Sequence, residues 1–307
     1  MIQRALRPLT LLSLLALFGL NCEKTIYTTD TEWPSFAVRP HVSAVTDTSV
    51  TIVFRTNEAC RFLLQLGVTT DYDTALADSE LAETHQVHLN QLESWTSYHY
   101  RVAIYDAEDN GPVFSADSTF RTLHNEWSYL REGWKAFATQ YYGGARDFFN
   151  LARTLNPTNA EILTALAWVQ IKDDSLAAAL QRLHEIRQYY PFLPVALTAE
   201  AYIRLLQDSV QQTIDLCQSV LTGQPEWSYP LNPHIGYPLL RFMLAQAYFH
   251  LELFAQAQAQ LDLIWPANGL DPNWPATWQV NGQDYSAYEL ALIAAISYLP
   301  TVAGFVI

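Results

Sequence analysis

Three prolines lie at equal intervals of 34 residues in the second half of the chain, at Pro157, Pro191 and Pro225. Each closes a stretch with the same order of small and large apolar residues. Proline cannot continue a helix, so it fixes the turn from one helical segment into the next. A helix–turn–helix unit of this length cannot bury its apolar face alone. The spacing therefore predicts a stack of such units.

The small residues of this pattern mark where the two helices of a unit cross closely, and the large ones fill the gap to the next unit. The third unit is degenerate, with Thr213 at a small position and Cys217 at a large one. The fourth unit follows an insertion at 226–237 and lacks a proline at the expected place. The residues that carry the pattern are Gly133, Ala145, Phe149 and Ala152; Leu163, Leu166, Ala167, Ala179, Leu183 and Ile186; Ala201, Ile214 and Val220; and Leu244, Ala245, Tyr248, Ala257, Leu261 and Ile264.

The four units, covering residues 124–264, resemble the tetratricopeptide repeat (TPR) family. The resemblance implies an all-α solenoid that holds a segment of a partner protein in its concave groove. TPR proteins often place a polar residue directly after the first small crossing residue, and only the fourth unit does so, with Gln246. The groove residues expected here are instead the aromatic ladder Trp134, Trp168 and Tyr202, and, one turn later, Phe137, Ile171, Leu205 and Phe249.

Two interpretations of the ladder are open from the sequence. In the first, the aromatic rings offer a large rigid surface to a partner. In the second, the chain itself fills the groove and the rings belong to the core. The segments expected to fill it are the apolar helix from Tyr285 to Leu299, within a C-terminal capping segment 283–307, or the N-terminal domain.

The first 22 residues have the pattern of a bacterial export signal. Arg4 and Arg7 precede an apolar run from Leu9 to Leu20, which is too short to span a bilayer. Cys22 follows the run directly and resembles a lipoprotein processing site, so we expect it to carry a lipid anchor. The polar segment 23–33 is expected to be a tether. These features predict an exported protein of the cell envelope, held at the outer membrane and facing the periplasm or the cell surface.

The charge of the chain argues against nucleic acid as a partner. The export signal holds two of the 17 basic residues and none of the 31 acidic ones, so the processed chain stays strongly acidic. Nucleic acid binding requires clusters of basic residues, and the sequence has none. The two remaining cysteines, Cys60 and Cys217, fall in different predicted domains and do not indicate a disulfide framework.

Between residues 34 and 123 the apolar residues alternate with period two, which indicates half-buried strands. The segment Leu92–Tyr98 resembles the tyrosine corner of a fibronectin type III domain, a small β-sandwich. Within that class it is most similar to the sandwich that precedes the catalytic domain in purple acid phosphatases. The metal-binding motifs of those enzymes do not follow here. At the start of the helices, Trp127 and Leu130 are expected to pack against the sandwich.

No metal site, cofactor or catalytic residue is predicted. His85 and His88 are three apart on a strand, so they point to opposite faces. Asp106, Glu108, Asp109, Asn110, Gly111 and Asp117 approximate a calcium loop, but strands flank them and a tight turn explains them better. Motifs such as GxSxG, HExxH and GxGxxG are missing from the sequence.

Two loops mix aromatic residues with proline and glycine: the insertion 226–237, with Trp227 and Tyr229, and the segment 265–282, with Trp274 and Trp278. Exposed rings in such loops can stack on sugars or on a proline-rich peptide. In the alternative interpretation, the loops plug the end of the solenoid and bind no ligand. The sequence therefore predicts a multidomain β + α protein, a fibronectin III-like β-sandwich followed by an all-α TPR-like solenoid, that acts as a non-catalytic protein–protein scaffold of the envelope. The alternatives are a carbohydrate or cell-wall binding module that uses these loops, and an accessory subunit of an extracellular enzyme.

Overall fold

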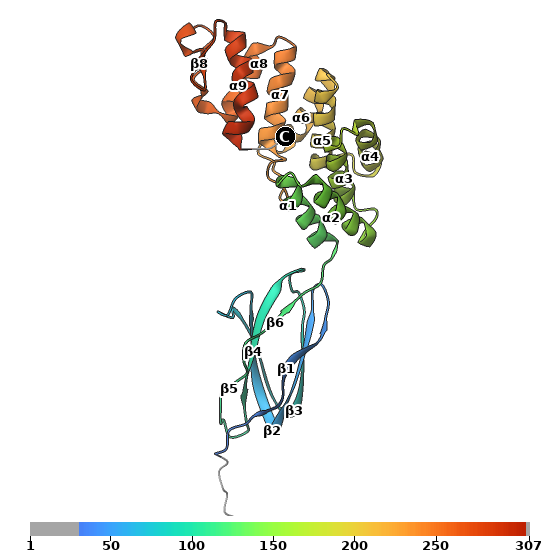
Figure 1. Ribbon diagram of the computed structural model, residues 1–307, viewed down its shortest axis with the longest axis vertical. Helices are drawn as coiled ribbons and strands as arrows, with labels where there is room; N and C mark the ends of the chain where they lie inside the picture. The colour runs from blue at the N-terminus through green and yellow to red at the C-terminus, as the bar shows by residue number, and fades with distance from the viewer. Residues whose placement is uncertain (1–30, 305–307) are drawn as a thin grey trace, which may run out of the picture.

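The computed structural model describes residues 31–304 and has the predicted order, a β-sandwich followed by helices (Figure 1). The export signal, Cys22 and most of the tether lie outside the described residues, as do residues 305–307. Figure 1 shows the sandwich and the helical array end to end along the longest axis of the molecule.

Antiparallel strands form the N-terminal domain. β1 pairs with the first part of β2, β4 pairs with the last part of β2, and β3 pairs with both parts. The short strands β5 and β6 extend the sheet beyond β4. The bounds are β1 Phe36–Val45, β2 Val50–Gly67, β3 Thr74–Leu89, β4 Ser97–Tyr105, β5 Val113–Phe114 and β6 Ser118–Arg121.

The two layers arise because β2 folds back on itself. Phe54 and Phe62 are eight residues apart, which a straight strand would separate by about 26 Å. Their ring centroids lie only 5.4 Å apart. The pairing of β2 with β3 is irregular between Arg55 and Cys60, where the strand changes layer. The two halves of β2 therefore face each other across the core of the sandwich.

The tyrosine corner is confirmed. The backbone N–H of Glu93 donates to the hydroxyl oxygen of Tyr98 over 2.9 Å. The Tyr98 ring is buried and stacks on Phe120 of β6, with centroids 5.4 Å apart. This contact fixes the chain that leads into β4, as in fibronectin-like sandwiches.

A stack of three rings joins the sandwich to the helices. His124 lies between Trp95, at a centroid distance of 3.6 Å, and Tyr129, at 4.1 Å. Asn125 caps the first helix and its Nδ2 also donates to the Asp47 carboxylate over 3.2 Å. Burial lowers the pKa of the His124 imidazole, so the ring is held in its neutral form.

The expectation that Trp127 and Leu130 pack against the sandwich is wrong. Leu130 is fully buried in the helical core, whereas Trp127 is 46% exposed and lines a surface pocket beside Asn156. Besides the ring stack and the Asn125 contact, the first helix reaches the sandwich through the guanidinium of Arg131, which donates to the Ser94 carbonyl over 3.2 Å.

Four antiparallel helix pairs form the array, as the repeated pattern of small and large residues predicts. Neighbouring helices pack in chain order, and the first helices of successive pairs also contact each other. The pairs are α1 Glu126–Ala138 with α2 Tyr142–Leu155, α3 Ala160–Lys172 with α4 Leu176–Tyr189, α5 Pro194–Leu206 with α6 Val210–Gly223, and α7 Tyr237–His250 with α8 Phe254–Ile264.

The turn inside each pair repeats in its backbone conformation. One residue of each turn has a left-handed backbone, which ends the first helix. The next N–H then donates back to the last turn of that helix, as Ser175 does to the Gln170 carbonyl over 2.8 Å. The left-handed residues are Gln140, Asp174, Asp208 and Glu252. The first three are 34 residues apart, which is the period of the prolines.

The fourth pair ends early. α8 has 11 residues where α6 has 14, and Pro266 follows directly after its last turn. The chain then passes through η1 Pro266–Asn268, η2 Pro275–Thr277 and the hairpin β7 Gln279–Val280 with β8 Gln283–Asp284. The last helix, α9 Tyr288–Ala303, packs on α7 and α8 and covers the end of the array (Figure 1).

The close crossing of α1 and α2 generates a prediction at Gly133. A Cβ at this position would overlap the ring of Phe149. We expect Gly133→Ala to destabilise the helical array by about 1–3 kcal/mol, because overpacking forces the helices apart. Chemical denaturation followed by circular dichroism measures this change.

Gly143→Ala is the matched control. It adds the same methyl group in α2 at a position where the new Cβ would meet nothing within 4 Å beyond its chain neighbours and the backbone of its own helix. It should be neutral or stabilise the array by up to about 1 kcal/mol, because alanine favours a helix more than glycine does. Equal stability of the two variants would contradict the predicted crossing.

Candidate functional site

The aromatic ladder forms on one side of the array. Trp134 comes from α1, Trp168 from α3 and Tyr202 from α5, the first helices of three successive pairs. The rings of Trp168 and Tyr202 stack with centroids 6.0 Å apart, and Phe137 bridges from Trp134 to Trp168. The 34-residue spacing thus brings these rings together.

Most of the ladder is core and not surface. Trp134 is 0% exposed and Trp168 is 3% exposed. Phe137 and Ile171, one turn later, are also buried. The interpretation in which these four residues contact a partner is therefore wrong. The alternative, in which the chain covers its own groove, describes this part of the molecule.

The covering segment is the insertion between α6 and α7. The ring of Tyr229 meets Trp134 edge-on, with centroids 5.4 Å apart. Its hydroxyl donates to the Glu161 carboxylate of α3 over 3.0 Å. Burial and the charge of Glu161 raise the pKa of the Tyr229 hydroxyl, which stays protonated. The insertion thus reaches back over the first two pairs, in place of the expected C-terminal helix or sandwich.

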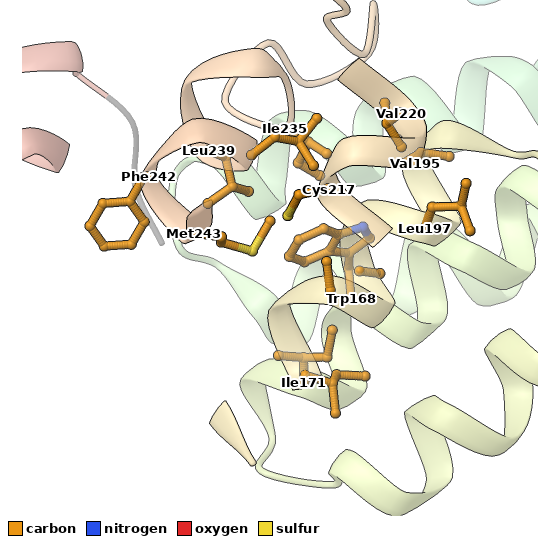
Figure 2. Packing of buried hydrophobic residues seen from close by; sticks show 14 of the residues in the cluster. Trp168, Ile171, Val195, Leu197, Cys217, Val220, Ile235, Leu239, Phe242 and Met243 are labelled. Atoms are coloured by element: carbon orange, nitrogen blue, oxygen red, sulfur yellow. The ribbon is translucent and has the colours of Figure 1, made fainter. Parts of the chain in front are cut away.

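A second anchor of the insertion is Ile235. Figure 2 shows Ile235 and Leu239 in one cluster with Trp168, Cys217 and Met243. All five side chains are buried. The insertion is therefore part of the core that holds the second, third and fourth pairs together.

Backbone hydrogen bonds give the insertion a defined conformation. The N–H of Tyr229 donates to the Ile235 carbonyl over 2.9 Å, and the N–H of Tyr237 donates to the Trp227 carbonyl over 2.7 Å. The buried Asn232 accepts from the N–H of His234 at its side-chain oxygen. These bonds close a compact loop whose apolar side faces the ladder.

The loop aromatics offer little exposed ring surface. Tyr229 is buried, and Trp227 packs against the helical core. The indole N–H of Trp278 donates to the Asp271 carbonyl over 2.8 Å, and its ring lies beside Tyr288. Trp274, at 62%, is the exposed ring among these four. A single ring does not make a stacking platform for sugars, so the geometry does not favour the carbohydrate alternative.

An open stretch of the concave face lies beyond the insertion, between α5 and α7. It is a hollow of about 380 Å³. Tyr202 and Leu205 of the predicted groove line it, whereas Phe249 packs against Phe254 at the far end of α7. Its lining is completed by Leu206, Phe242, Gln246 and His250. Gln246 stands at the position that the ladder residues occupy in the other pairs.

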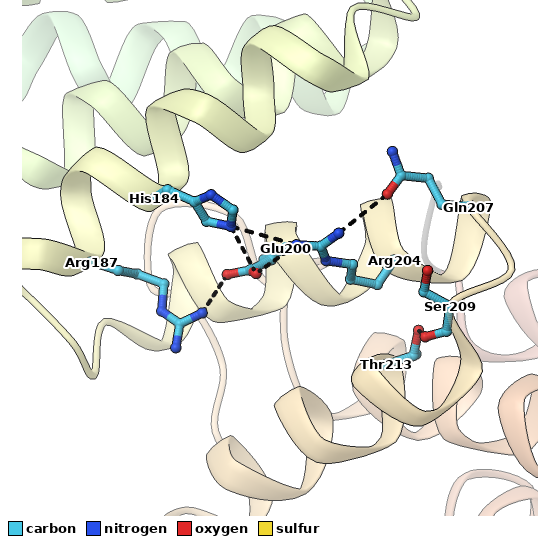
Figure 3. A network of polar contacts seen from close by, with 7 residues as sticks. All are labelled: His184, Arg187, Glu200, Arg204, Gln207, Ser209 and Thr213. Atoms are coloured by element: carbon cyan, nitrogen blue, oxygen red, sulfur yellow. Dashed lines mark hydrogen bonds and ion pairs between the residues drawn. The ribbon is translucent and has the colours of Figure 1, made fainter.

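A buried carboxylate with charged partners nearer the surface fixes α5, which carries one wall of this hollow. Figure 3 shows Glu200 between Arg187 and His184 of α4 and Arg204 of its own helix. The Arg187 guanidinium lies 2.7 Å from the Glu200 carboxylate, and that of Arg204 lies 3.5 Å from it. A buried carboxylate needs such partners, because an unpaired buried charge is strongly destabilising.

Sequence reasoning missed three residues of the hollow, Leu206, Phe242 and His250. The signal was present, since each lies one turn or less from a ladder position on α5 or α7. The ladder is defined by register, as the residue after the small crossing residue and the residue one turn later. Exposure depends on where the insertion ends, which the pattern does not contain.

The calcium-like segment is a turn, as the flanking strands predict. One Asp106 carboxylate oxygen accepts from the N–H groups of Glu108 and Asn110. His85 is buried and His88 exposed, on opposite faces of β3. Within residues 31–304, no three His, Cys, Asp or Glu residues are grouped so as to hold a metal ion. In the same range, no helix is long and apolar enough to cross a membrane.

Parts of the chain are similar to proteins of known structure. No family model and no curated protein match it. A thermophilic TPR protein of Thermus thermophilus is similar at 17% identity over 58% of this chain and 83% of that chain, with a TM-score of 0.41. A tetratricopeptide repeat protein of Parabacteroides merdae is similar at 14% identity over 58% and 60%, with a TM-score of 0.36.

The N-terminal domain is similar to a different group of solved structures. The fibronectin type III domain of a human fibronectin type III domain containing protein is similar at 16% identity over 32% of this chain and 94% of that chain, with a TM-score of 0.26. The molecule is a fibronectin III-like sandwich followed by a TPR-like solenoid. That description rests on the repeated helix pairs, the layered strands and the tyrosine corner.

The covering insertion generates a prediction at Tyr229. We expect Tyr229→Ala to destabilise the array by about 3–5 kcal/mol, because it removes a buried ring from the ladder. The same change should expose Trp134 to water, so the tryptophan fluorescence of the folded variant should shift to longer wavelength.

Tyr229→Phe is the control, since it keeps the ring and removes only the hydrogen bond to Glu161. It should cost about 1–3 kcal/mol and leave the fluorescence maximum unchanged. A Tyr229→Ala variant with the stability and emission of the unaltered protein would show that the insertion does not cover the ladder.

Proposed function

We propose that this chain is a non-catalytic scaffold of the bacterial cell envelope, which holds a segment of a partner protein in the open hollow between α5 and α7. Export and a lipid anchor at Cys22 would place it there. The observation that carries the proposal is the hollow itself, on the concave face of a repeat array. Such faces are extended surfaces suited to peptides and protein segments.

The chemistry of the hollow suits an extended segment. Tyr202 and Leu205 offer apolar contact area, and Leu206 is 53% exposed at the rim. The Gln246 amide has both a donor and an acceptor, which a peptide backbone can satisfy in turn. A hollow of this size takes one or two side chains, so the expected partner segment is short.

The test is a crosslinked pull-down from the native envelope. Leu206→Glu places a charge at the rim of the hollow without touching the buried ladder. We expect this variant to lose at least one protein that the unaltered chain retains, because a carboxylate disfavours apolar contact. Gln246→Ala should weaken the same interaction by removing the amide.

Leu263→Glu is the matched control, since Leu263 is 56% exposed on α8 and does not line the hollow. It should keep every partner. If Leu206→Glu folds and also keeps every partner, the hollow is not the binding site and this proposal is wrong.

The envelope part of the proposal has its own test at Cys22. A diacylated cysteine adds two long apolar chains, and each buried methylene contributes about 0.8 kcal/mol to membrane binding. Cys22→Ser should therefore lower the mass of the purified protein and move it from the membrane fraction to the soluble one. An unchanged mass and an unchanged fraction would contradict lipidation.

A further inference from the structure

A second cleft lies away from the concave hollow, between α2 and α4, with α3 as its floor. Its volume is about 290 Å³. Leu166 and Val169 form an apolar base, and polar side chains stand around it. These are Arg146, Asn150 and Arg153 of α2, Gln170 and Asp173 at the end of α3, Ser175 directly before α4, and Arg182 of α4.

The cleft concentrates positive charge in an acidic protein. The chain has 31 acidic and 17 basic residues, and only nine of the basic ones lie between residues 124 and 304. Three of those nine line this cleft. The one carboxylate in its wall, Asp173, forms an ion pair with Arg146. Two guanidinium groups are therefore left without a carboxylate in the wall to balance them.

The two remaining arginines differ in their contacts. Arg182 Nε donates to the Gln170 side-chain oxygen over 3.1 Å. Among the contacts of residues 31–304, none pairs the Arg153 guanidinium with a carboxylate or another hydrogen-bond acceptor. Burial lowers the pKa of Arg182, and the neighbouring charge of Arg153 lowers it further, whereas the charge of Glu185 raises it. An anion between the two groups would relieve this repulsion.

An apolar pocket of about 250 Å³ adjoins the cleft and shares Arg182 as a wall. Leu163, Ile186 and Tyr190 line it, and Glu185 stands at its edge. A ligand that fills both sites has an anionic group next to an apolar one. An acidic residue beside an apolar residue in a protein segment meets this requirement.

We propose that this outer cleft binds a carboxylate side chain of a partner protein, with a neighbouring apolar side chain of the same segment in the adjoining pocket. Guanidinium forks match the geometry of a carboxylate. Counting Asp173 and Glu185 against the three arginines leaves one positive charge, which a single carboxylate neutralises. A phosphate dianion would leave the site negative beside Asp173. The cleft is independent of the hollow between α5 and α7.

The test is an NMR titration of the purified protein with a short capped peptide, acetyl-Gly-Ser-Glu-Leu-Gly-amide. The side-chain signals of the cleft arginines should shift and saturate. Replacing Glu by Gln in the peptide should abolish the shift, and replacing Leu by Ala should weaken binding. Arg153→Gln should weaken binding of the Glu peptide about tenfold or more, as expected for loss of a charge-assisted hydrogen bond.

Two further variants separate charge from folding. Arg153→Lys keeps the charge but not the fork, so its affinity should fall between those of the unaltered protein and Arg153→Gln. Arg241→Gln removes a guanidinium that bonds Gln260, remote from the cleft, and should bind the peptide normally. A loss of binding in Arg241→Gln equal to that in Arg153→Gln would overturn the proposal.

Three further outcomes would also overturn the proposal. Equal binding of the Glu and Gln peptides would overturn the carboxylate assignment. Saturable binding of inorganic phosphate without binding of the Glu peptide would show a phosphate site and overturn it as well. An absence of any shift at millimolar peptide would show that the cleft binds no such segment. None of these results depends on whether Leu206→Glu loses a partner.

Discussion

The close crossing of two helices in each repeat is the constraint on which the helical half depends. Gly133, Ala167, Ala201 and Ala245 leave room for it, and a residue with a left-handed backbone stands in the turn that follows each time. Because each pair buries only part of its apolar surface, the next pair must stack on it. A repeated local geometry therefore produces a long array with an inner and an outer side.

The insertion changes what the inner side can do. In a bare array, the aromatic ladder would be exposed, and exposed apolar patches of this kind bind partners or aggregate. Tyr229 and Ile235 cover the ladder on the first two pairs and leave the hollow between α5 and α7 open. The result is a short open hollow, and the ion pairs of Glu200 hold α5 at one side of it.

The sequence predicts the local features well and the long-range ones poorly. The 34-residue period, the small crossing residues and the tyrosine corner at Tyr98 are local patterns, and each one appears in the structure. The side on which the insertion packs depends on contacts between segments up to about a hundred residues apart, which no local pattern contains. No local pattern predicts the outer cleft either, because Arg153 and Arg182 come together only once two repeats have stacked.

Hydrogen exchange of the insertion tests the central claim, that this segment belongs to the core of the free protein, most directly. The amides of Tyr229 and Ile235 donate within the loop, and the side chains of both residues are buried. Their exchange should be slowed as much as that of amides in the middle of α3, because opening them would uncover the ladder. Exchange at the rate of an unstructured chain would contradict the account and leave the whole concave face open to partners.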